Sequence, residues 1–327
     1  MSIFKFIYLI FGISLLIFIF NKIDIPLFIN ELNKLGFNFL LILLIYFFGF
    51  ILDSISWRLC IESLVPKKIK LYEIFKIRII GEAFNYIILQ VGGEPVKAFL
   101  LKKKFNIKYK TSIGSLILAK TIILFALIIF CFIGLLSIFH TNKFGHYYET
   151  VSLIGFLFFT ILICLFFIIQ RYKLTSKIHT IFKDRLSKKI NIIFKHLKET
   201  EHKISEFYKS DRKNFFKILF LNLCNWFIGA LELYVIFILL NQKITFFEAV
   251  AIETLVQLVR AVLFFIPSNL GTQEGVFVLA VNILKDSMPL GLAVAIIRRM
   301  RELIWISCGV IFGYNQNIDI KKIKQKL

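Results

Sequence analysis

The chain has 327 residues, of which 58% are hydrophobic and 16% are aromatic, and its formal net charge is +21. So much apolar surface excludes a water-soluble globular domain and predicts an all-α polytopic membrane protein. The positive charge would suggest nucleic acid in a soluble protein, but the basic residues gather between apolar runs and no nucleic-acid-binding module is present, so we expect no nucleic-acid partner.

Several apolar runs are long enough to cross a bilayer, which takes about 20 residues of helix. The first of them lacks a small-residue cleavage site, so we interpret it as a retained anchor. Two further segments, 77–101 and 247–284, are hydrophobic but interrupted by glycine and charged residues. The sequence therefore predicts about six transmembrane helices, over residues 3–20, 37–60, 112–139, 150–170, 214–240 and 290–313.

Lysine and arginine are distributed unequally between the connecting segments. Twenty-seven of the 41 basic residues lie in segments 61–76, 102–110 and 171–217 and in the C-terminal tail. Connecting segments rich in Lys and Arg stay on the cytoplasmic side of a membrane. We therefore expect a multi-pass protein of the bacterial inner membrane with both termini in the cytoplasm.

This orientation places both ends of 77–101 in the cytoplasm and both ends of 247–284 outside. The first segment has 25 residues, too few for two helical crossings of about 30 Å each at 1.5 Å per residue. It is therefore predicted to be a re-entrant hairpin. A re-entrant hairpin is also favoured for 247–284, with two full crossings as the alternative because 247–266 alone is long enough to span.

Each interrupted segment has a full span on either side, and the two triplets run in opposite directions through the membrane. This pattern predicts an inverted-topology repeat within one integral membrane domain over residues 1–327. The first half covers 37–139 and the second covers 214–313. Between them, 171–213 is a basic cytoplasmic connector whose apolar residues recur at helical spacing, which predicts amphipathic helices on the inner leaflet or against the bundle, with a solvated connector as the alternative.

Broken backbone is tolerated at membrane depth only where protein or water satisfies its polar groups, so the two breaks are expected to line a cavity. The returning arms are predicted to begin near Pro95 and Gly275 and to present helix N-termini on which an anionic group such as a lipid phosphate can dock. Glu94 and Glu274 either cap these arms alone or cap them and also serve function, since an ionisable group at this depth is costly.

Charged and amide side chains recur at helical spacing on both interrupted segments and on the last span. Paired charges inside a membrane mark substrate or proton paths more often than packing. The candidate substrate-binding residues are Arg78, Glu82, Asn85, Gly93, Glu94, Glu253, Gln257, Arg260, Gly271, Gln273, Glu274, Arg298, Arg301 and Glu302. By contrast, Asp53, Arg58 and Lys120 are expected only to extend from span ends towards water.

The span 214–240 carries a polar stripe of its own. Asn222, Asn225, Gly229 and Glu232 follow one another at helical spacing. They either face the same interior as the charged residues or serve the packing of neighbouring helices.

No motif in the chain indicates catalysis. The Gly-Gly of QVGGEPV lacks the following Lys and Ser or Thr of a phosphate loop, and the five cysteines are too widely spaced for metal ligands. We expect no cofactor, no metal and no enzyme activity. The alternative is a membrane enzyme or accessory subunit that transfers a glycosyl or aminoacyl group to a lipid.

Three segments resemble the flippase-like transmembrane domain of lysylphosphatidylglycerol synthases, most closely its stand-alone branch found with bacterial hopanoid biosynthesis: GEAFNYIILQVGGEPVKAFLLKKK, ETLVQLVRAVLFFIPSNLGTQEGVFVLA and AIIRRMRELIW. The resemblance covers residues 37 to 313. Members usually carry Pro-Gly where this chain has Pro267 and Ser268. No soluble aminoacyl-transfer domain follows the last span, so lysyl transfer is not expected.

The resemblance implies an inner-membrane lipid flippase or lipid-handling transporter in envelope biogenesis, with anionic phospholipid or hopanoid as the partner. Arg78, Arg260 and Arg298 would attract a headgroup, and Glu94 and Glu274 would hold the broken helices. With a neutral hopanoid, the arginines would matter chiefly as partners for the glutamates. A third possibility is a scaffold that recruits lipid-biosynthesis enzymes through its basic connector.

Overall fold

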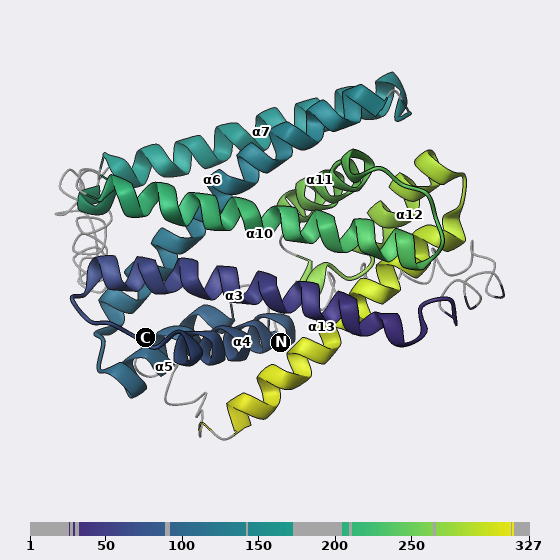
Figure 1. The fold of residues 1–327 in the computed structure, drawn as a ribbon. Coiled ribbons are helices and arrows are strands. Elements are labelled where there is room, and N and C mark those ends of the chain that lie inside the picture. The colour runs from purple at the N-terminus through teal and green to yellow at the C-terminus, as the bar shows by residue number, and fades with distance from the viewer. Residues whose placement is uncertain are drawn as a thin grey trace, which may run out of the picture.

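A computed structural model shows that the described part of the chain is built from long helices without strands, which confirms the all-α membrane class (Figure 1). The predicted anchor over 3–20 and most of the connector over 171–213 lie outside the described residues. The structure describes residues 26, 29, 33–88, 92–141, 143–172, 205–208, 211–263, 266–314 and 316.

The helices follow the predicted order of span, broken hairpin and span in each half. The first half contains η1 (Gly36–Asn38), α3 (Phe39–Leu64), α4 (Leu71–Ile88), α5 (Gly93–Phe105) and α6 (Tyr109–Thr141), and α7 (Gly145–Arg171) comes next. The second half contains α10 (Arg212–Leu239), α11 (Phe246–Val262), η3 (Pro267–Asn269), α12 (Thr272–Lys285) and α13 (Met288–Tyr314).

Four of the described helices are long and apolar enough to cross a membrane, and they match four of the six predicted spans: α3 with η1, α6, α7 and α10. Helix α13 has 27 residues but does not meet the same apolar criterion. The reason is a run of charge in its middle, where Arg298, Arg299 and Arg301 are buried against other helices instead of facing lipid.

The connecting segments gather at two opposite ends of the bundle (Figure 1). At the basic end, which holds segments 65–70 and 106–108, the ammonium group of Lys67 donates a hydrogen bond to the Phe105 carbonyl at 2.7 Å. At the other end, Lys143 forms an ion pair with Glu248 at 2.7 Å. The two lysine-rich loops that the structure describes in full therefore share one end of the molecule, as the charge distribution predicted for them.

Each interrupted segment folds into a hairpin that begins and finishes at one end of the bundle. Near the outer ends of α4 and α5, Lys104 donates a 2.6 Å hydrogen bond to Glu73, and this bond lowers the pKa of the Glu73 carboxyl. At the opposite end, Lys285 of α12 donates to the backbone carbonyl of Lys243, just before α11. The first hairpin is longer than the predicted 77–101 because its helices extend to Leu71 and Phe105.

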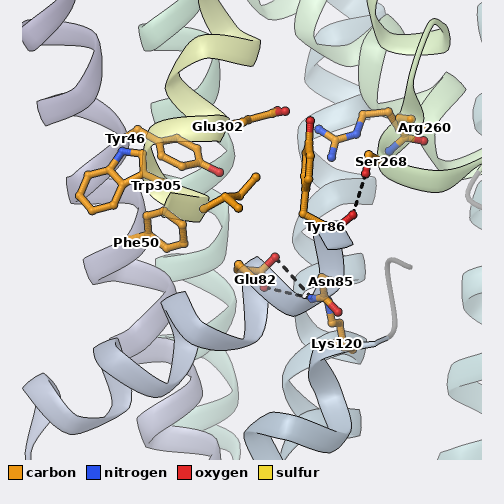
Figure 2. A pocket seen from close by; sticks show the side chains of 12 residues that line it. Tyr46, Phe50, Glu82, Asn85, Tyr86, Lys120, Arg260, Ser268, Glu302 and Trp305 are labelled. Atoms are coloured by element: carbon orange, nitrogen blue, oxygen red, sulfur yellow. Dashed lines mark hydrogen bonds between the residues drawn. The ribbon is translucent and has the colours of Figure 1, made fainter. Parts of the chain in front are cut away.

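The tips of the two hairpins meet inside the bundle. The Ser268 hydroxyl, in the break of the second hairpin, donates to the Tyr86 carbonyl near the tip of the first at 3.0 Å (Figure 2). Hairpins that enter from opposite ends and touch at their tips each reach only part of the way across the bundle, which is the geometry predicted for re-entrant hairpins. The returning arms begin at Gly93 and Thr272, two and three residues before the predicted positions.

Helix packing repeats between the two halves. Helix α4 packs on α13, α11 packs on α6, and the arms of each hairpin pack on one another. At the centre, α3 and α10 lie side by side and run in opposite directions (Figure 1). This is the arrangement that an inverted-topology repeat predicts. Two relations are not repeated: α6 packs closely along both α10 and α3, whereas α13 has no comparable close packing with α3 or α10.

Close approach of α13 to α4 depends on a glycine, and this gives a stability prediction. A Cβ atom at Gly309 would lie 2.5 Å from the Ile79 carbonyl oxygen and 2.8 Å from the Ala83 Cβ. Gly309→Ala is therefore expected to lower the free energy of unfolding by about 1–3 kcal/mol, which is the usual cost of overpacking. Thermal unfolding in detergent measures this.

The matched control is Gly155→Ala in α7, where an added Cβ meets no atom within 4 Å. Alanine there is expected to be neutral or slightly stabilising, because it is the better helix former. Equal melting temperatures for both variants would contradict the packing described here.

Candidate functional site

Two adjoining cavities that share lining residues lie where the hairpin tips meet, with volumes of about 230 Å³ and about 290 Å³. We call them together the central cavity. Figure 2 shows an aromatic wall of Tyr46, Phe50 and Trp305 facing polar side chains from the two hairpins. Single ligand pockets typically measure about 300–1,000 Å³. The residues that line both parts are Tyr46, Phe50, Glu82, Lys120, Arg260 and Glu302.

The first hairpin contributes a network of alternating charges. Arg78 forms ion pairs with Asp53 of α3 and, at 3.2 Å, with Glu82 one turn along α4. From the returning arm, the wholly buried Lys97 forms ion pairs with Glu82 at 3.0 Å and with Glu94 at 3.1 Å. Buried charges are tolerated when they are paired in this way, so these side chains fix the two arms of the hairpin to one another and to α3.

The two break glutamates, Glu94 and Glu274, have different roles at the helix starts. Glu274 accepts the backbone N–H of Gly271 at 2.8 Å and therefore caps α12. The prediction that Glu94 also caps its arm is wrong. The amide oxygen of Asn85, on the opposite arm, accepts the Gly93 N–H at 2.7 Å, and this leaves the Glu94 carboxylate to the lysines.

The second half builds its own network around the arginines of α13. Arg298 forms an ion pair with Glu253 of α11 at 2.5 Å and donates to the Gly229 carbonyl of α10. Glu253 also accepts from Gln257 at 2.7 Å. One turn further along α13, Arg301 pairs with the wholly buried Glu232. The glutamates of α10 and α11 are therefore held against α13.

Arg299 joins the two halves, and the sequence prediction did not include it. Its guanidinium donates to Glu274 at 2.9 Å and to Glu302 at 2.9 Å. It also donates to the Tyr86 hydroxyl at 3.0 Å and to the Ser268 carbonyl at 3.1 Å. One side chain of α13 thus holds the tips of both hairpins.

Two cations of the central cavity are held loosely. Arg260 makes no hydrogen bond or ion pair with any described residue, although it lines both parts of the cavity. Lys120 is half exposed and forms one ion pair, with Glu94 at 3.6 Å. These two side chains are positioned to receive an anionic group.

Three residues that we expected only to extend towards water divide into two groups. Lys120 lines the central cavity, and Asp53 is the ion-pair partner of Arg78, so the prediction is wrong for both. The apolar runs around them hid the fact that they face the protein interior. Arg58 instead pairs with Glu62 at 3.5 Å and lines neither part of the cavity.

The polar stripe of α10 serves both of its proposed purposes. Asn225, Gly229 and Glu232 line the central cavity. Asn222 lies deeper and donates to the Ser56 hydroxyl of α3 at 2.9 Å, a contact between packed helices.

The structure brings most of the predicted site residues together. Gly93, Glu94, Gly271, Gln273 and Glu274 do not line the central cavity and instead belong to the breaks and the returning arms. Besides Arg299, the prediction missed Tyr46, Phe50, Lys97 and Trp305. The predicted residues that do line it are Arg78, Glu82, Asn85, Glu253, Gln257, Arg260, Arg298, Arg301 and Glu302.

The fold and the site define an integral membrane protein with a polar chamber at membrane depth between two broken hairpins, which is where secondary transporters bind substrate. The sequence profile of the lysylphosphatidylglycerol synthase TM region matches residues 5–308, and the chain belongs to this family. Searches of curated proteins and of solved structures found no match. Membership of the family indicates a role in handling membrane lipid.

Proposed function

We propose that this protein moves phospholipid between the leaflets of the bacterial inner membrane, with the headgroup passing through the central cavity. The observation that carries the proposal is Arg260 at the meeting point of the hairpins, a cation that is attracted by Glu302 but makes no hydrogen bond or ion pair with the described residues. A charge at this depth without a direct hydrogen-bonded partner is costly. A lipid phosphate would match it, because arginine binds phosphate oxygens with two parallel hydrogen bonds.

The remaining charges of the site favour an anionic group over a neutral one. Apart from Arg260, every cation in the two networks has a carboxylate partner in the described structure. A neutral hopanoid-type lipid would leave Arg260 unmatched, so phospholipid is the substrate that we propose. A link with hopanoid-based envelope pathways would then concern where the lipid is used, not what the cavity binds.

The inverted halves supply a route for alternating exposure. Rocking of one half against the other would open the central cavity first to one end of the bundle and then to the other. Contacts between the hairpin tips, such as that of Ser268 with Tyr86, would break and re-form during this motion. We place the basic end in the cytoplasm, where lysine side chains meet anionic lipid headgroups.

Translocation in proteoliposomes tests the proposal. Wild-type protein is reconstituted with fluorescent phosphatidylglycerol or with a neutral hopanoid-like lipid, and protein-free vesicles measure the background. We expect phosphatidylglycerol to reach the opposite leaflet faster than background and faster than the neutral lipid. Failure of folded protein to move either lipid would contradict a flippase and support an accessory subunit or a scaffold.

A further inference from the structure

A cluster of aromatic rings lies between α3 and α13, formed by Tyr46, Phe47, Phe50, Phe75 and Trp305. We call it the aromatic seam. Trp305 of α13 is at its centre. The indole stacks on Phe47 at a centroid distance of 5.9 Å and contacts Phe50 at 5.4 Å and Tyr46 at 6.5 Å. Phe75 of α4 packs on Phe47 at 5.6 Å. The two helices therefore meet mainly through these rings.

The corresponding seam of the other half is closed. There α6 packs along α10, and the indole N–H of Trp226 donates to the Ile123 carbonyl at 3.3 Å. The Trp305 indole N–H is also buried, but it has no hydrogen-bond partner within the described part of the chain. A buried donor without an acceptor is costly, so a tryptophan at this place calls for an acceptor from outside the protein.

The aromatic seam separates the bilayer from the central cavity. On its outer side, Leu44 and Phe48 of α3 and Leu303 and Ile304 of α13 are exposed apolar side chains, as lipid-facing residues are. On its inner side, Tyr46, Phe50 and Trp305 line the cavity.

We propose that the aromatic seam is the lateral binding site for the glycerol-ester region of a diacyl phospholipid. This inference rests on the proposed function and extends it. The two parts of the cavity measure about 230 Å³ and about 290 Å³, each below the range of about 300–1,000 Å³ for a small-molecule pocket, so the acyl chains are expected to remain in the bilayer while the headgroup is inside. The lipid then crosses the protein boundary between α3 and α13, and one of its ester carbonyls accepts the hydrogen bond of Trp305. Indole suits this position because it combines a broad apolar ring with one donor.

The test compares two lipids that differ only in this acceptor. Diester and diether phosphatidylglycerol of equal chain length are translocated by wild type and by Trp305→Phe, which keeps a ring and removes the N–H. We expect wild type to move the diester lipid about 3- to 10-fold faster than the diether lipid, the range for one hydrogen bond. In Trp305→Phe this ratio is expected to fall to about 1.

Trp226→Phe is the control: Trp226 also lines the central cavity, but its N–H is already bonded to the Ile123 carbonyl within the closed seam. It is expected to keep the diester preference of wild type, even if its melting temperature falls. A purely structural role of Trp305 would slow both lipids equally and leave the ratio unchanged. That result, or an equal loss of preference in Trp226→Phe, would overturn the proposal.

A second measurement requires binding alone, so it remains decisive if the variants misfold or if the protein moves no lipid. A diester phosphatidylglycerol with a photoreactive diazirine beside the ester is cross-linked to wild type, and the adducts are mapped by mass spectrometry. Enrichment at Phe47, Phe50 and Trp305 supports the seam even if no translocation occurs. Adducts spread evenly along lipid-facing helices, or enriched between α6 and α10, would refute it while leaving the proposed function intact.

Discussion

Replacement of Arg260 with glutamine is expected to slow phospholipid translocation by about 10- to 100-fold, because a charge-assisted hydrogen bond contributes about 1.5–3 kcal/mol. The variant should fold as wild type does. Arg260 makes no ion pair with the described residues, and Glu302, which it attracts, keeps its ion pairs with Arg299 and Arg301, so we expect a change in the free energy of unfolding within about 0.5 kcal/mol. Initial rates in proteoliposomes and melting in detergent measure the two quantities.

Two further variants make the Arg260 result specific. Arg260→Lys keeps the charge but loses the two-pronged geometry and is expected to recover part of the rate. Arg58→Gln removes an arginine that pairs with Glu62 away from the cavity, and it should translocate at the wild-type rate. An Arg260→Gln variant as fast as Arg58→Gln would remove the main support for a phosphate in the central cavity.

Arg299→Gln is expected to destabilise the protein by about 3–5 kcal/mol, since removing one partner of a buried ion pair leaves the other charge uncompensated. The side chain of Glu274 is 3% exposed and loses its partner, while Glu302 keeps an ion pair with Arg301 at 3.3 Å. The effect should appear as a lower melting temperature and a lower yield of folded protein.

The double variant Arg299→Gln with Glu274→Gln separates charge from packing. With both charges gone, no carboxylate is left alone, so the double variant is expected to be more stable than Arg299→Gln. Loss of the Gly271 cap would remain, because glutamine is a weaker acceptor than the carboxylate of Glu274. If the losses of the two single variants simply added, the ion pair would not be what holds these tips.

The fold was predictable from sequence because each element leaves a local signal. Apolar runs fix the spans, and the lysines of KKKFNIKYK fix which loops share an end. Because both ends of segment 77–101 were placed on the same side of the membrane, this segment had to form a hairpin. Span 290–313 showed the limit of this reasoning, since hydropathy alone does not reveal that the three arginines of α13 find partners inside the protein.

The pairing of the site residues was predictable where both partners lie on one helix. Arg78 with Glu82, and Glu253 with Gln257, are one turn apart and stand out in the sequence. Arg299 was missed although Glu302 lies three residues along the same helix, and its contacts with Glu274 and with the tip of the first hairpin come from other helices and leave no local pattern. The aromatic rings of the cavity carry no signal in a chain so rich in phenylalanine.

Serine stands in the break of the second hairpin at a position whose backbone suits glycine. Ser268 and Asn269 have φ angles of 54° and 49°, in the left-handed region that glycine adopts freely. A residue with a Cβ there costs about 1–2 kcal/mol. The hydrogen bond from the Ser268 hydroxyl to the Tyr86 carbonyl offsets part of this cost. The serine therefore gives up backbone freedom and gains a contact between the tips.

The most direct test of the account is a structure of the protein determined in phosphatidylglycerol nanodiscs. We expect a phosphate group in the central cavity within hydrogen-bond distance of the Arg260 guanidinium, with acyl chains leaving between α3 and α13. A cavity that contains only water, with every ordered lipid headgroup outside the bundle, would contradict the claim that lipid passes between the hairpin tips.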